Sequence, residues 1–380
     1  MRLKHQDASQ PAHPINVGDP LFRCFGRHFL FLKNKSAEKR QQNLCVPEKA
    51  ALDYRAMAAN RKLNFTGVVP IWAALLLVGA FLGTWRGYGG RHFAFALLAI
   101  AILLAGMLFP AAGNFGQAIM NWLNRRGVWI AVLVPLSAFA LYELLAIGVD
   151  WKSILFGAAY FMIPLVLIAS AGSSAPGSWQ DYFAILAIWI PVELHRLNRL
   201  FPYPAELTHT LTILFALNLA LAGFFFLRRL DGIGYSIEWG RGFGFEVGFN
   251  FGIFALIAIP LGEAIGFIHF DPSVARLRSL PLFGLGILFF TAWPEEFLFR
   301  GLIQNLLAKS LRSPYTALFV AAVIFGLSHI NNGTFPNWRY VILATIAGIF
   351  YGRAWLKTGS IFASCLVHAA VDILWHTLFR

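Results

Sequence analysis

The sequence has few charged residues. Asp, Glu, Lys and Arg make up 13% of its 380 positions, and apolar or aromatic residues make up 58%, whereas a soluble globular domain carries about 25% charged residues. The apolar residues occur in long blocks, for example 68–83, 93–112, 128–149 and 211–226. Each block approaches or exceeds the roughly 18 to 20 residues that cross a bilayer as a helix. The composition therefore excludes a soluble domain and predicts a polytopic membrane protein.

Strict alternation of apolar and polar residues is also missing, and cysteine is rare. Strands of a membrane β-barrel alternate over segments of about ten residues, and the apolar blocks here do not, which excludes a barrel. The three cysteines, Cys24, Cys45 and Cys365, provide neither a disulfide framework nor a Cys-x-x-Cys metal pair. We expect no redox chemistry, and we interpret Cys365 as a small packing residue rather than a nucleophile.

Breaks at Gly, Pro and charged residues divide the chain into ten or eleven expected membrane helices. These are placed near residues 67–83, 92–111, 127–149, 153–172, 182–197, 211–227, 247–269, 281–303, 314–330, 339–356 and 360–378. The predicted fold class is an all-α polytopic transmembrane bundle. A charged, Gly-rich stretch over 228–246 is expected to be a cytoplasmic loop. It would separate an N-terminal bundle of unknown role, 67–227, from a C-terminal bundle, 247–380.

The positive charge is concentrated before the first expected span. The net charge is +13, and residues 1–66 contribute twelve basic and five acidic residues, or +7. A basic segment in this position favours a cytoplasmic leader that is held inside by its charge and attracted to anionic lipid. We therefore expect a multi-pass protein of the cell membrane with a cytoplasmic N-terminus, membrane lipids as partners and no nucleic acid partner.

Two interpretations of the leader, 1–66, are open. It lacks the short basic head, apolar centre and small-residue cleavage site of a secretory signal peptide. It would then remain as a cytoplasmic segment. Met57, followed by Ala-Ala-Asn-Arg-Lys, offers an alternative start with a short basic head, in which case the first 56 residues are a start-site artefact.

A charged group inside an apolar span indicates a functional site, because each such residue costs roughly 2.5 to 3.5 kcal/mol on insertion scales. The densest group is Pro-Glu-Glu-Phe-Leu-Phe-Arg-Gly at 294–301. Glu296 and Arg300 are four residues apart, so they share a helical face and can form an ion pair. Glu295 points about 100° away and stays free for other work.

Two further spans carry histidines deep inside. His329 ends the sequence Phe-Gly-Leu-Ser-His, and His368 precedes Asp372 by four residues, so these two share a helical face. Depth is counted at about 1.5 Å per residue from the expected cytoplasmic residues Lys309, Arg312 and Lys357. Glu295, His329 and His368 then lie about 21, 25 and 17 Å deep, respectively. Because the three depths agree to within about 8 Å, the sequence predicts a single intramembrane site.

Several functions are open to such a group. A glutamate assisted by one histidine can deprotonate water for attack on an amide, while a second histidine stabilises the oxyanion. Alternatively, Glu295, His329 and His368 could bind Zn²⁺ and leave an open position for water. Both chemistries are hydrolysis of a membrane-associated protein or peptide. A proton-coupled transporter is the alternative from another class, because buried Glu, His and Asp also serve as proton relays.

The three motifs together resemble a known family. In order, Glu-Glu-x-x-x-Arg at 295–300, Phe-x-x-x-His at 325–329 and His-x-x-x-Asp at 368–372 are similar to the motifs of the CPBP intramembrane proteases, which include the prenyl-protein (CAAX) endopeptidase and the Abi bacteriocin-immunity proteins. The resemblance covers roughly 247–378. It implies a helical bundle in which Glu295 and His329 activate water, and in which His368 and residue 372 form the oxyanion site.

One position departs from the family pattern. The prenyl-protein branch usually has Asn where this chain has Asp372. An ionised Asp cannot donate to an oxyanion, so Asp372 must either be protonated or orient His368. A catalytically silent Abi-like immunity or scaffold protein is a further alternative. Five other ionisable residues in or near the spans form no comparable motif: Glu143, Glu193, His195, Glu263 and His269.

Overall fold

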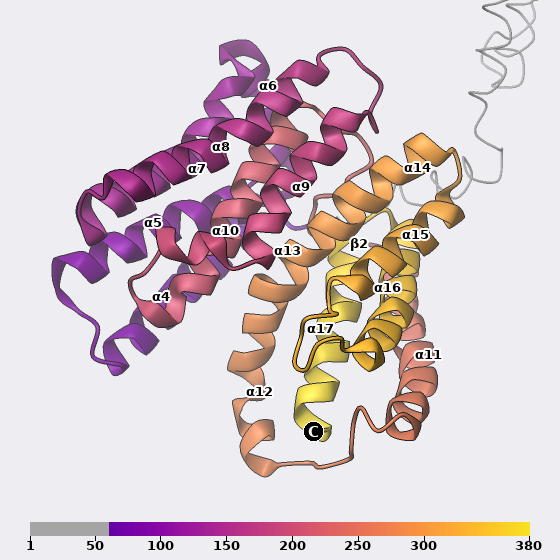
Figure 1. The fold of residues 1–380 in the computed structure, drawn as a ribbon. Helices are drawn as coiled ribbons and strands as arrows, with labels where there is room; N and C mark the ends of the chain where they lie inside the picture. The colour runs from indigo at the N-terminus through magenta and orange to yellow at the C-terminus, as the bar shows by residue number, and fades with distance from the viewer. Residues whose placement is uncertain (1–60) are drawn as a thin grey trace, which may run out of the picture. The chain divides into compact units, whose positions relative to one another are not determined.

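Helices form nearly all of the regular structure in residues 61–380, the part of the chain that this computed structural model describes (Figure 1). Eight helical stretches there are long and apolar enough to cross a membrane. The two strands of this region, β1 (Arg61–Lys62) and β2 (Glu238–Trp239), form one short antiparallel pair. The predicted all-α membrane bundle is thus confirmed. Residues 1–60 of the expected leader, with Met57, lie outside the described residues.

The N-terminal set of helices extends from α4 to η7. Its members are α4 (Phe65–Trp85), α5 (Gly90–Leu108), α6 (Gly113–Arg126), the 3₁₀-helix η3 (Val128–Val132), α7 (Leu133–Leu141), the π-helix η4 (Tyr142–Ile147), α8 (Trp151–Ala171), α9 (Trp179–Glu193), the 3₁₀-helices η5 (Arg196–Leu200) and η6 (Ala205–Leu207), α10 (Thr208–Ala220) and the π-helix η7 (Leu221–Leu227). The amphipathic helix α6 was not predicted, because its Asn, Gln and Arg residues interrupt the apolar pattern of a span.

The C-terminal set extends from α11 to α17. Its members are α11 (Phe243–Ala264), α12 (Val274–Ile287), the π-helix η8 (Leu288–Ala292), α13 (Trp293–Glu296), the π-helix η9 (Phe297–Gln304), α14 (Asn305–Leu311), α15 (Pro314–Leu327), α16 (Trp338–Thr358) and α17 (Ile361–Leu378). The segments from α12 to α14 form one continuous helix of 38 residues, Val274–Leu311. π-Helical turns therefore flank the short segment α13, and such turns are frequent at functional sites.

Every span that the sequence predicts corresponds to a helix, although three of these helices fall short of a full span. Helix α9 has 15 residues and α15 has 14. Helix α16 has 21 residues, but Arg339, Arg353 and Lys357 lower its apolar character. The count of ten or eleven predicted helices thus includes eight that meet both the length and the composition of a membrane span.

Short connections set the ends of α15, α16 and α17. The side chain of Ser313 caps the N-terminus of α15. Gly359, with a φ of 68°, ends α16 in the left-handed conformation that favours glycine, and Ser360 caps α17 directly afterwards. These caps fix which turn of each helix carries a functional side chain, so that His329 follows the C-terminal end of α15 and His368 lies within α17.

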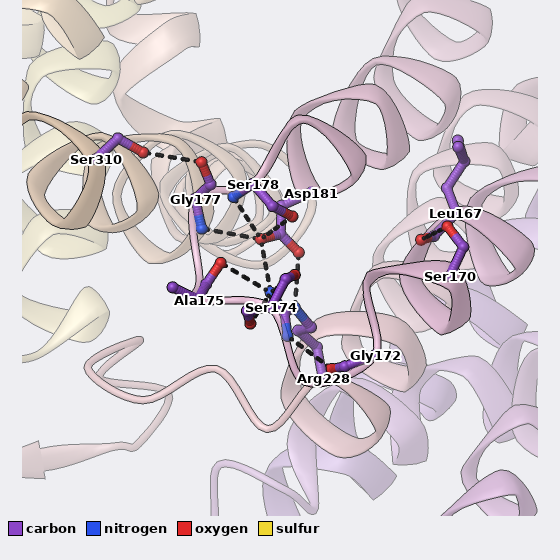
Figure 2. Close-up of polar contacts among 10 residues, drawn as sticks. All are labelled: Leu167, Ser170, Gly172, Ser174, Ala175, Gly177, Ser178, Asp181, Arg228 and Ser310. Atoms are coloured by element: carbon purple, nitrogen blue, oxygen red, sulfur yellow. Dashed lines mark hydrogen bonds and ion pairs between the residues drawn. The ribbon is translucent and has the colours of Figure 1, made fainter.

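A buried ion pair fixes the start of α9 (Figure 2). Arg228, which follows η7, donates from Nε to Oδ1 of Asp181 at 2.8 Å, and the exposed fractions of the two side chains are 6% and 0%. Asp181 also accepts from the backbone N–H groups of Gly177 at 2.9 Å and Ser178 at 3.1 Å. Arg228 donates to the carbonyl oxygen of Ser174 at 3.0 Å. These contacts therefore hold the loop between α8 and α9 against the end of η7.

Helix α9 runs antiparallel to the continuous helix Val274–Leu311. Near the start of α9, the Ser310 hydroxyl donates to the carbonyl oxygen of Gly177 at 3.1 Å (Figure 2), and Ser310 Oγ lies 2.8 Å from the Tyr182 hydroxyl. Further along α9, the rings of Trp189 and Phe299 pack edge to face with centroids 5.4 Å apart. Residue numbers rise along α9 while they fall along its partner. The contacts between these two helices thus join the N-terminal set to the C-terminal set.

The chain between the two sets packs on the C-terminal set. The Asn305 side chain donates to the carbonyl oxygen of Asp231 at 2.9 Å, and the Trp355 indole N–H donates to that of Ile233 at 3.1 Å. Lys309 Nζ lies 2.7 Å from Oδ1 of Asp231, and this hydrogen bond holds the pKa of the Asp231 carboxyl below its usual value. The loop therefore adds polar anchors at the ends of α14 and α16.

Candidate active site

The predicted pair Glu296 and Arg300 is formed and fully buried. Arg300 Nε lies 3.0 Å from Glu296 Oε2, and the exposed fractions of the side chains are 1% and 0%. Arg300 also donates from Nη2 to the carbonyl oxygen of Gly348 at 3.2 Å. Its guanidinium carbon lies 4.7 Å from the ring centroid of Phe325 and 5.3 Å from that of Tyr351, which adds cation–π stabilisation. The arginine therefore neutralises Glu296 and ties α13 to α15 and α16.

His368 is held by the second oxygen of the same carboxylate. Its Nδ1 lies 2.8 Å from Glu296 Oε1, and its ring stacks on Tyr351 with centroids 4.6 Å apart and 16° between the planes. On the other side of the ring, Nε2 lies 3.5 Å from Asp372 Oδ2 and 3.9 Å from Glu295 Oε2. Both oxygens of Glu296 are engaged, so this residue is not available as a base, and Nε2 of His368 is directed toward Glu295.

Glu295 differs from its neighbour in having a free carboxylate. Its side chain is 34% exposed. Among residues 61–380, no side chain or backbone group forms a hydrogen bond with its carboxylate, and Oε2 lies 3.9 Å from Nε2 of His368. The predicted divergence of Glu295 and Glu296 on the helix is therefore observed. The free carboxylate of Glu295 lies on the wall of a cavity of about 300 Å³.

His329 lies on the wall of the same cavity. Its Nδ1 is 2.8 Å from the carbonyl oxygen of Phe325 and 3.1 Å from Oγ of Ser328. Because a carbonyl oxygen can only accept, we assign the ring proton to Nδ1. In the neutral ring, Nε2 is then the acceptor. His329 thus has a nitrogen that is able to take a proton.

The cavity lies between the two sets of helices. Its wall is formed by the last turns of α9, by α10, by the continuous helix around α13, and by the turn after α15. Its lining residues with polar groups are Trp189, Glu193, His195, His209, Thr291, Glu295, Ser328, His329, Asn331 and Asn332. His368 does not line it and is only 3% exposed. The structure therefore brings the three predicted helices to one site, with Glu295 and His329 at the cavity and His368 behind Glu295.

Sequence reasoning missed two residues that hold His368 in place. Ser364 Oγ lies within hydrogen-bond distance of Glu296 and 2.8 Å from the carbonyl oxygen of Tyr351. Ser364 precedes His368 by four residues, so the same helical spacing that pairs His368 with Asp372 was a signal that could have identified Ser364. Tyr351 has no comparable pattern in the sequence, because its role comes from the packing of α16 against α17.

The remaining ionisable residues of the spans divide into two groups. Glu193 and His195 line the cavity, together with His209, which no motif had indicated. Glu143, Glu263 and His269 do not. Glu143 is 1% exposed in η4 of the N-terminal set, and the backbone of His269 pairs with that of Arg380. A contribution of the N-terminal set to the cavity was therefore not expected from the motifs.

The described side chains do not form a metal site. Among residues 61–380, no group of three or more His, Cys, Asp or Glu side chains is arranged to hold one. Glu295 and His368 approach each other, but Nδ1 of His368 is taken by Glu296, and His329 lines the cavity from the turn after α15. A zinc ion needs about four ligands near 2.0 to 2.3 Å. These side chains, as placed, do not fit that requirement.

Comparison with known proteins bears on the C-terminal set. Residues 277–374 match the family model described as Rce1-like, type II CAAX prenyl endopeptidase. No curated protein and no solved structure matches the chain. The matched segment contains all six candidate residues, namely Glu295, Glu296, Arg300, His329, His368 and Asp372. The chain is therefore a multi-pass membrane protein whose C-terminal segment is similar to the CAAX-type proteases of the CPBP family.

Proposed function

We propose that this protein is an intramembrane endopeptidase in which Glu295, assisted by His329, activates a water molecule for hydrolysis of a peptide bond. One observation carries the proposal. Of two adjacent glutamates on one helix, Glu296 is fully occupied by Arg300 and His368, while Glu295 has a free carboxylate on the wall of a cavity that His329 shares. A general base needs a free lone pair within reach of its water.

The proposed reaction follows from these positions. Glu295, or Nε2 of His329, takes a proton from water as the water oxygen attacks the carbonyl carbon of the substrate. The tetrahedral intermediate collapses when this proton is passed to the leaving amide nitrogen. The C–N bond breaks, and the products are a carboxylic acid and an amine. Because Glu295 and His329 line the same cavity, one of them can hold the proton while the other orients the water.

We assign supporting roles to the remaining residues. As an imidazolium that donates from Nδ1–H to Glu296, His368 would stabilise the developing oxyanion through Nε2–H, because Glu296 and Tyr351 hold its ring and Nε2 points toward Glu295. Asp372, at 3.5 Å from that nitrogen, would orient His368 rather than donate to the oxyanion. Arg300 would keep Glu296 ionised so that Glu296 accepts from Nδ1 of His368.

The substrate would be a membrane-associated protein or peptide. The name of the matching family refers to prenylated CAAX proteins, and such a protein is one candidate substrate for this chain. We further propose that no zinc takes part, that the chain resides in the cell membrane, and that its N-terminus is cytoplasmic.

The test compares membranes that contain the wild-type protein with membranes that contain Glu295→Gln at equal protein level. Quantitative mass spectrometry of new protein termini should find at least one substrate that is cleaved only by the wild type. If both membranes give the same termini, the proposal is wrong and a silent scaffold is favoured. A proton-coupled uptake current in reconstituted vesicles that disappears in Glu295→Gln, with no cleaved protein, would favour a carrier.

A further inference from the structure

Glu193 of the N-terminal set lines the same cavity as Glu295. It lies on α9, which contacts the continuous helix Val274–Leu311 through Tyr182 with Ser310 and through Trp189 with Phe299. Glu193 is four residues after Trp189, and Glu295 is four residues before Phe299, so each glutamate lies about one helical turn, roughly 6 Å, beyond the contact of Trp189 with Phe299. Both line the cavity of about 300 Å³.

The carboxylate of Glu193 is held in place but keeps free acceptor capacity. The indole N–H of Trp189 donates to Glu193 Oε2 at 3.2 Å, and the Trp189 ring is fixed in turn against Phe299. No other hydrogen bond reaches this carboxylate from the residues that the structure describes. Glu193 Oε1 is therefore able to accept from a bound molecule.

The charge of the cavity wall has one sign. Glu193 and Glu295 are its acidic residues, and among the described residues that line it there is no Lys or Arg. The amides Asn331 and Asn332, which also line the cavity, carry no charge. A cation between the two carboxylates is favoured by both of them, whereas a second carboxylate is repelled.

We propose that Glu193 is a specificity-determining residue that binds a Lys or Arg side chain of the substrate next to the scissile bond. This inference rests on the proposed protease function and deepens it. The cavity volume is at the lower end of the roughly 300 to 1,000 Å³ that ligand sites occupy. Only a short stretch of peptide fits, so a basic side chain at Glu193 belongs to a residue close to the bond that faces Glu295.

The cleavage test uses a chymotryptic peptide library of a whole proteome at pH 8. Purified wild-type protein, Glu193→Gln, Glu193→Lys and Glu295→Gln are compared, with Glu263→Gln as a control for loss of a carboxylate away from the cavity. Wild type and Glu263→Gln should prefer sites with a neighbouring Lys or Arg on the order of fivefold over Glu or Asp, the upper range for an exposed ion pair. Glu193→Gln should lose this preference, and Glu193→Lys should reverse it.

The outcomes separate the inference from the proposed function. Equal site preference in wild type and Glu193→Gln overturns the role of Glu193 and leaves the protease intact. Cleavage that persists in Glu295→Gln overturns the proposed function.

A binding assay decides the inference even if no library peptide is cleaved. Fluorescence anisotropy on Glu295→Gln compares two labelled Leu-Ala decapeptides that differ only in a central Lys or Glu. The inference is supported if Glu295→Gln binds the Lys peptide more tightly than the Glu peptide and if this difference is lost in the double variant with Glu193→Gln. Equal binding of the two peptides to Glu295→Gln overturns it.

Discussion

Nδ1 of His368 lies 2.8 Å from Oε1 of Glu296, across 72 residues of sequence. This contact distinguishes the two adjacent glutamates. Glu296, bound by His368 and Arg300, has the surroundings of a structural carboxylate, and Glu295 is left with a free one. Because His368 contacts Glu296 in this way, the position of the His368 ring depends on the charge of Glu296.

Arg300→Ala should lower the stability of the protein. Removal of the guanidinium leaves Glu296 as a buried carboxylate without its ion partner, and breaking a buried pair in this way costs about 3 to 5 kcal/mol. We expect less protein in the membrane and an unfolding transition at lower denaturant in SDS titration. The double variant Arg300→Met with Glu296→Gln removes both charges and should recover part of the loss. Normal stability of Arg300→Ala would contradict the structural role of the pair.

Asp372→Asn should remain active, with only a moderate loss. Its carboxylate is 3.5 Å from Nε2 of His368, whereas Glu296 holds Nδ1 at 2.8 Å. An Asn of the same shape can still accept from His368, and a single hydrogen bond contributes about 0.5 to 1.5 kcal/mol, so kcat should fall by no more than about tenfold. Asp372→Leu should fall further. A loss in Asp372→Asn equal to that in Glu295→Gln would show that the Asp372 carboxylate takes part in the chemistry.

Activity should survive removal of metal ions. The described side chains form no three-residue metal site, and the proposed base is Glu295. Protein in detergent is treated exhaustively with a strong chelator, and cleavage is measured before and after, alongside the metal content by mass spectrometry. About one zinc per chain together with chelator-sensitive activity, restored by added Zn²⁺, would replace the glutamate–histidine mechanism with a metal mechanism.

Arg228→Ala should loosen the loop between α8 and α9 in the N-terminal set. The substitution leaves Asp181 buried without its partner, although the N–H groups of Gly177 and Ser178 still donate to it. We expect a loss of about 3 kcal/mol and faster proteolysis of the α8–α9 loop. Arg125→Ala, at an exposed position in α6, is the matched control and should behave as wild type. Equal protection of the loop in both variants would contradict this role.

Much of the site was predictable because it depends on local helical spacing. The pair Glu296 and Arg300 and the approach of His368 to Asp372 both follow from a separation of four residues within one helix. The long apolar blocks predicted the helices, since backbone groups in lipid must satisfy their hydrogen bonds internally. The order of the three motifs indicated the resemblance to the CPBP proteases, which the match over 277–374 confirmed.

The contacts between distant helices were not predictable in the same way. Nothing in the spacing places Glu296 against His368, leaves His368 outside the cavity, or brings Glu193 to the same cavity as Glu295. In a membrane protein, lipid-facing and helix-facing surfaces are both apolar, so hydrophobic periodicity does not tell which face of a span meets which neighbour. That choice depends on how side chains such as Trp189 and Phe299 fit together, and close packing of this kind exists only once the helices are assembled.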